Sequence, residues 1–180
     1  MTASEPLHFH SPRYGLMLVF NEQVRLAIAF DALWADPSLD GPFSCFDERA
    51  GTRLVGEAGV KEIEAVGYAT IGQDSFPCLG CSELWPETPA KVLSLWLHAD
   101  DALRLGRVAD DWLAGLGRRV WPMLHFSFGI VADSFLRDYW EYQTNPLLDA
   151  RLEPRVPRQS YGLLLPARDS ADIDWHPPSA

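Results

Sequence analysis

Cysteine is scarce in this sequence and occurs only at positions 45, 78 and 81. The N-terminal residues lack the basic start and apolar core of a signal peptide. An odd number of cysteines without such a signal argues against a disulfide framework and predicts reduced thiols. Long apolar runs are lacking too, because no stretch approaches the ~18 residues of a membrane helix. We therefore expect a cytoplasmic protein that does not cross a membrane.

Basic residues are also few, with 15 Lys and Arg against 25 Asp and Glu and a net charge of −10. Proteins that bind nucleic acid or anionic membranes need clustered Lys and Arg, so we expect neither as a partner. The negative charge is uneven, because residues 36–87 contain ten acidic residues and only three basic ones. The three bases are Arg49, Arg53 and Lys61. This stretch therefore suits a basic partner.

Catalytic motifs are missing as well. The sequence contains no G-x-S-x-G, P-loop, H-E-x-x-H or G-x-G-x-x-G pattern, so we expect no catalytic residue, metal or cofactor. Cys78-Leu79-Gly80-Cys81 has a spacing that can hold one edge of a zinc site or form an exchangeable disulfide. A second ligand pair is lacking, and the segment is rich in proline. We interpret both residues as ordinary loop cysteines and keep metal and redox roles as alternatives.

The composition predicts one folded domain. Hydrophobic residues make up 47% of the 180 residues, which is enough for a single core but little for two. We expect one domain over residues 1–180, with an ordered core at about 12–168 and a tail at 170–180. Patterns of polar and apolar residues then predict the elements within it.

Two segments alternate in the manner of strands, at residues 92–98 and 123–131. In each, one face is apolar and the other is semi-polar. The apolar faces carry Leu93, Leu95 and Leu97 in the first segment and Leu124, Phe126, Phe128 and Ile130 in the second. The semi-polar faces carry Val92, Ser94, Trp96 and His98, and Met123, His125, Ser127, Gly129 and Val131. A helix at about residues 100–119 joins them, with Leu105, Val108, Trp112 and Leu116 predicted to face the core.

Other elements are less regular. We predict strands at residues 14–20, 52–55, 67–71 and 160–165, a short helix at 60–66 and a further helix at 134–144. Residues 24–35 favour a helix over a hairpin strand, and residues 73–91 are predicted to be a long connection. The fold class is α+β: a single-domain sandwich with a mixed or antiparallel sheet and two to three helices packed mainly on one face. A ferredoxin-like topology with additions is our specific prediction.

Two functions fit these patterns. In the first, the chain is a non-catalytic interaction protein, such as an immunity protein or antitoxin that inhibits a toxin enzyme. An acidic surface with an exposed indole would then bind the basic partner. The predicted contact residues are Asp36, Asp40, Asp47, Glu48, Glu57, Glu62, Glu64, Asp74, Glu83, Trp85 and Glu87.

The second function is a small-molecule-binding domain or enzyme with a pocket on the semi-polar sheet face. Its predicted lining is Ser94, Trp96, His98, His125 and Ser127. For the two histidines we favour a structural interpretation, in which each caps a strand or forms a hydrogen bond on a partly exposed sheet. A third alternative is a homodimer that buries this same face.

Overall fold

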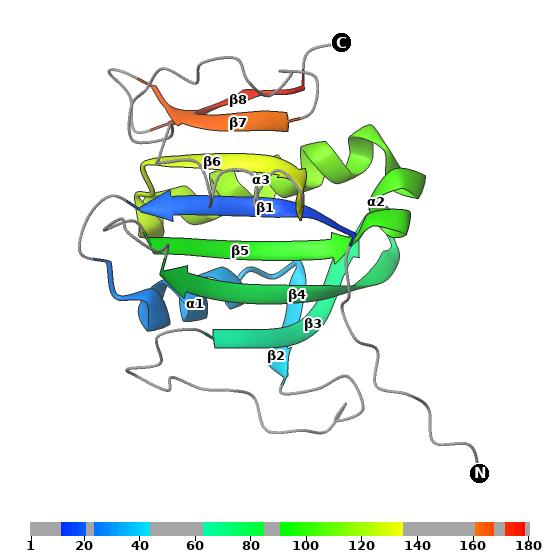
Figure 1. Cartoon of the computed structure of the whole chain (residues 1–180), viewed down its shortest axis with the longest axis horizontal. Coiled ribbons are helices and arrows are strands. Elements are labelled where there is room, and N and C mark those ends of the chain that lie inside the picture. Colours follow the sequence, from blue (N-terminus) through cyan, green and yellow to red (C-terminus); the bar gives the residue numbers. More distant parts are fainter. Residues whose placement is uncertain are drawn as a thin grey trace.

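A computed structural model describes residues 12–20, 24–43, 63–84, 91–134, 161–167 and 172–178. Eight strands form one antiparallel sheet in the order β2-β3-β4-β5-β1-β6-β7-β8, accompanied by three helices in the described residues (Figure 1). The predicted α+β class is confirmed. The elements are β1 (Arg13–Phe20), α1 (Leu26–Trp34), β2 (Leu39–Phe43), β3 (Ile63–Ile71), β4 (Asp74–Leu84), β5 (Lys91–His98), α2 (Ala99–Leu105), α3 (Arg107–Leu124), β6 (Phe128–Asp133), β7 (Tyr161–Pro166) and β8 (Ile173–His176).

The centre of the sheet is formed by β4, β5, β1 and β6. Strand β1 lies between β5 and β6, which follow one another in the chain through α2 and α3. Because both pair antiparallel with β1, they run parallel to each other without being neighbours. Strands β2 and β3 extend one side of this centre, and β7 and β8 extend the other. The ferredoxin-like topology stays a prediction.

Both faces of the central strands are buried. In β1, Leu16 and Leu18 pack with α1 and α3, whereas Met17 and Val19 belong to a second cluster on the opposite face. The described members of that second cluster all come from strands, and none comes from a helix. The described helices therefore cover one face, as predicted. No helix in this part of the chain is long and apolar enough to cross a membrane.

Three glycines, Gly41, Gly67 and Gly80, form a platform for one indole. Ideal Cβ atoms at Gly41, Gly67 and Gly80 would all lie 2.4–2.8 Å from atoms of the Trp34 ring. Trp34 ends α1 and is only 3% exposed. The predicted helix at 60–66 is wrong for residues 63–66, and the predicted connection at 73–91 is wrong for residues 74–84 and 91, because these residues are in strands. Glycine here permits close packing of a helix on the sheet, not a series of turns.

The predicted helix at 100–119 is two helices that meet at Gly106, where φ is +57°. Leu113, Leu116 and Val120 of α3 are fully buried, as their spacing indicates. Val108, which we placed on the core face, is 55% exposed. The change of direction at Gly106 rotates the first turn of α3 away from the face predicted for one continuous helix.

The remaining predicted elements have different outcomes. Residues 26–34 are helical, as the favoured interpretation of 24–35 has it, and the predicted strands at 14–20 and 160–165 correspond to β1 and β7. Residues 173–176, which we assigned to a tail, form β8 against β7. The predicted strand at 52–55 and nearly all of the helix predicted at 134–144 lie outside the described residues.

Candidate protein-interaction surface

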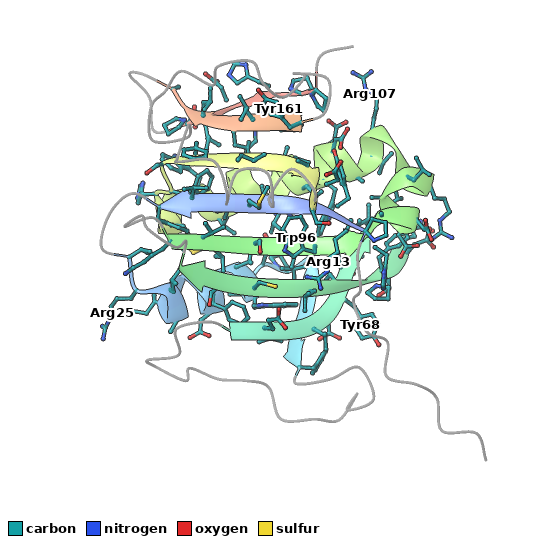
Figure 2. The ribbon with its side chains drawn as sticks, viewed as in Figure 1. Arg13, Arg25, Tyr68, Trp96, Arg107 and Tyr161 are labelled. Carbon is teal, nitrogen blue, oxygen red and sulfur yellow. The ribbon has the colours of Figure 1, made fainter. Side chains whose placement is uncertain are left out.

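Strands β2, β3 and β4 form one side of the sheet and contain no Lys, Arg or His. Their described acidic side chains are Asp40, Glu64 and Asp74, and all three are exposed. Asp40 lies opposite Tyr68 of β3, and Glu64 is on the same face of that strand because strand side chains alternate. Asp74 follows the β3–β4 turn and lies opposite Ile71, so it is on the helix-covered face, whereas Asp40 and Glu64 are on the other face. We call these three carboxylates the acidic edge. Figure 2 shows Tyr68 in this outer part of the sheet, away from Trp96 at its centre.

The main chain of β2 is poorly suited to accept a further strand. It ends the described sheet, contains Pro42, and changes register with β3 between Asp40 and Phe43. Proline has no N–H to donate, and register shifts interrupt the ladder of an edge strand. A partner that contacts this edge would therefore bind through side chains.

Asp36, predicted to contact a partner, is instead a buried residue of the fold. The guanidinium of Arg119 donates from Nε to Oδ2 (2.8 Å) and from Nη2 to Oδ1 (3.2 Å), and Ser38 donates to Oδ1 from both its N–H and its hydroxyl. Burial raises the pKa of the Asp36 carboxyl, but these hydrogen bonds and the Arg119 charge outweigh burial and lower it. The carboxylate thus fixes the start of β2 to α3 and is not available to a partner.

Replacing Arg119 by methionine is expected to lower the stability at pH 7 by about 1–2 kcal/mol. This is less than for a fully buried pair, because the Arg119 side chain is 44% exposed. A lowered native pKa stabilises the fold above the unfolded value near 3.9 and stops doing so as the pH falls through the native value. The deficit should therefore shrink in urea titrations as the pH falls below about 3.9 and through the lowered native pKa. Arg118→Met, a change at the exposed neighbour, should cost much less; an equal cost would contradict this role.

The remaining predicted contact residues cannot be placed. Asp47, Glu48, Glu57, Glu62, Trp85 and Glu87 lie outside the described residues. Glu83 belongs to β4, but its side chain is also outside the description. The acidic edge is therefore the described part of the surface predicted from residues 36–87.

Two of the predicted pocket residues, Ser94 and Trp96, lie on the same face of β5 and are hydrogen-bonded to each other. The Trp96 indole N–H donates to the Ser94 hydroxyl at 2.8 Å, and both side chains are buried. Trp96 packs in the second cluster with Met17 and Ile130. The face that we predicted to be semi-polar is thus apolar around Trp96, because the indole N–H and the Ser94 hydroxyl are hydrogen-bonded to each other inside the fold.

The other three predicted pocket residues are not gathered around Trp96. The predicted strand at 123–131 was wrong at its start, since α3 runs to Leu124 and His125 ends it with φ +47°. Ser127 lies before β6 and bonds Val19, whereas His98 is opposite Arg13 at the other end of β1. Six residues of strand correspond to about 20 Å. Ser127 and the adjacent His125 are therefore far from His98.

The predicted faces of β6 are also reversed. Phe128 and Ile130 lie in the second cluster, on the Trp96 side, while Val131 lies in the helix-covered core. Phe126 is in the helix-covered core, so the alternation expected from Phe126 to Phe128 does not hold. The chain between α3 and β6 is not extended, and this changes which face each later residue occupies.

Cys78 and Cys81 are in β4, not in a loop, and point to opposite faces of the sheet. Cys78 belongs to the helix-covered core and Cys81 to the second cluster. Burial, with a smaller contribution from the Asp40 charge, raises the pKa of the Cys78 thiol and disfavours thiolate. Two thiols on opposite faces cannot share a metal or a disulfide without rearrangement of the strand.

A polar contact that the sequence did not suggest joins β1 to α3. The Tyr14 hydroxyl donates to Asp110 Oδ1 at 2.5 Å. Burial raises the pKa of the Asp110 carboxyl, and the negative charge of Asp111 raises it further. The hydrogen bond from Tyr14 acts in the opposite direction, but the pKa remains raised. Burial also raises the pKa of Tyr14, helped by the hydrogen bond to Asp110. Aspartates are common in the first turn of a helix, where they are usually solvated. The presence of Asp110 there therefore does not indicate a contact with Tyr14.

Asp110→Asn is expected to stabilise the protein at pH 7, by less than about 1 kcal/mol because the carboxyl is partly exposed. The asparagine oxygen can still accept from Tyr14, while the charge that burial disfavours is removed. A raised native pKa gives stability that is complete below the unfolded value near 3.9 and is lost as the pH rises through the native value. The gain should thus disappear at pH 3–4 in urea titrations. A gain independent of pH would contradict the assignment.

Comparison with protein-family models, with curated proteins and with solved structures found no match to this chain. A function must therefore be argued from the surfaces and side chains themselves, because fold class alone does not determine function.

Proposed function

We propose that this chain is a non-catalytic interaction protein that binds and neutralises a basic partner, as an immunity protein or antitoxin does with a toxin enzyme. The observation that carries the proposal is the acidic edge: Asp40, Glu64 and Asp74 are exposed on three adjacent strands without a basic residue. Carboxylates that face a cationic substrate site would accelerate association and occlude that site.

The pocket alternative receives less support from the described side chains. Ser94 and Trp96 are paired with each other inside a buried cluster, and His98 is far from His125 and Ser127. In contrast, the acidic edge is on the outside of the fold, and the change of register in β2 favours contacts through its side chains. The proposal also agrees with the net charge of −10.

The test is to co-express the chain with the products of its chromosomal neighbours and to purify it at low and then high salt. We expect a stoichiometric basic protein that dissociates as the ionic strength rises, because exposed charges are screened. That protein should be toxic or enzymatically active alone and inactive in the complex. Retention of a partner that is equally tight at all salt concentrations would argue against an electrostatic surface, and recovery of the lone chain would argue against the function.

A further inference from the structure

The connection between α2 and α3 exposes two large apolar side chains. We call residues 103–108 the elbow; it changes direction at Gly106, and Leu103 and Val108 on either side of it are 82% and 55% exposed. The other large exposed apolar residues in the described ranges are Ile28 and Met123. Single exposed apolar residues are common, whereas neighbouring ones that form a patch mark interaction sites, and these two side chains belong to one short connection.

The elbow lies beside Asp74, the member of the acidic edge on the helix-covered face of the sheet. The guanidinium carbon of Arg104 is 5.5 Å from the centre of the Phe76 ring, and Phe76 is two residues after Asp74 in β4. Figure 1 shows α2 at the end of the sheet where β3 turns into β4. Residues 72–75 of this turn are all exposed. The elbow and the turn therefore contribute neighbouring parts of the molecular surface.

Acidic groups predominate around the elbow. Asp74, Asp100 and Asp111 are exposed, and Arg104 is paired with Asp101 at 3.0 Å. Arg107 is the other base of the elbow and projects from the helical end of the molecule in Figure 2. A partner that fits this surface would need basic groups for the carboxylates and an apolar recess for the two exposed side chains.

We propose that Leu103 and Val108 are the apolar anchor of the partner-binding surface, and that they fit a basic protein whose apolar recess is surrounded by Lys and Arg. This inference rests on the proposed function. Exposed carboxylates mainly speed association and lose their effect in salt, whereas a desolvated apolar contact slows dissociation. The anchor thus supplies a contribution to affinity that depends little on ionic strength.

Two labelled peptides of equal length and charge test the anchor by fluorescence anisotropy: one alternates Lys with Leu, and the other alternates Lys with Ser. At low salt we expect the native protein to bind both, and to prefer the Lys-Leu peptide by about tenfold. The double variant Leu103→Ser/Val108→Ser should lose this preference and keep its affinity for the Lys-Ser peptide. The control Ile28→Ser/Met123→Ser, which changes the other two large exposed apolar residues of the described ranges, should keep the preference.

The outcomes separate the two proposals. If the native protein binds both peptides equally, or if the preference survives in the elbow variant, the anchor is refuted while the acidic surface stands. If neither peptide binds at low salt, the acidic surface fails, and the anchor that rests on it fails with it. Loss of the preference in the control variant as well would also overturn the assignment to the elbow.

Discussion

Replacing Asp40 and Glu64 together by lysine is expected to weaken binding of the basic partner on the order of 100-fold at low ionic strength. Each substitution removes an attraction and introduces a repulsion, and like charges placed together at an interface cost several kcal/mol. Both side chains are exposed on the acidic edge, so the fold should tolerate the change. The loss should appear mainly in the association rate and should diminish as salt is added.

The matched control is Asp172→Lys/Asp174→Lys, which makes the same change of net charge near β8, at the other side of the sheet. Surface plasmon resonance with the partner identified by co-expression, at two ionic strengths, measures both variants. The control should lower affinity only slightly, through the net charge. Equal effects of the two variants would show that the overall charge, and not the acidic edge, determines binding.

Much of the fold could be predicted because its central strands have simple patterns. In β5 the alternation of Leu93, Leu95 and Leu97 with Ser94 and Trp96 places each side chain on its observed face. Period-two patterns are reliable where both neighbours of a strand are regular, as β4 and β1 are here. The α+β class with helices on one face follows from such patterns.

The errors have specific physical causes. Residues 123–131 alternate as a strand would, yet Leu116, Val120 and Leu124 continue the helical spacing past Pro122, and packing of that helical face prevails. Proline usually disfavours the interior of a helix, but α3 continues past Pro122 to Leu124. The alternating pattern of residues 123–131, taken apart from the helix before it, therefore predicts a strand where α3 still continues.

The candidate site was harder to predict than the fold. Whether a carboxylate is exposed depends on distant partners, and nothing near Asp36 indicates that Arg119 will bind it from α3. The elbow was missed for the same reason, since Val108 fits a helical core pattern until Gly106 turns the chain. Composition points to an acidic region, but tertiary contacts decide which of its residues reach the surface.

The largest effect on stability is expected for Gly15→Ala. Gly15 is in β1 opposite Trp96, and an ideal Cβ there would lie 2.0 Å from the carbonyl oxygen of Leu95 and 2.8 Å from Cε3 of the Trp96 ring. The oxygen belongs to the main chain of the central strand β5, so relief requires the two strands to separate. We expect a loss of about 3 kcal/mol or more, at the upper end of overpacking effects.

Gly115→Ala in α3 provides the control, since the same methyl group should there have the opposite effect. An ideal Cβ at Gly115 approaches only Nη1 of Arg119, at 3.2 Å, and this atom is the end of a flexible side chain that holds Asp36 through Nε and Nη2. Alanine favours the helix over glycine by about 0.5–1 kcal/mol. Urea titrations should thus move the two midpoints in opposite directions. A Gly15→Ala midpoint near that of the native protein would mean that β1 and β5 are not in the close contact on which the buried Trp96 cluster depends.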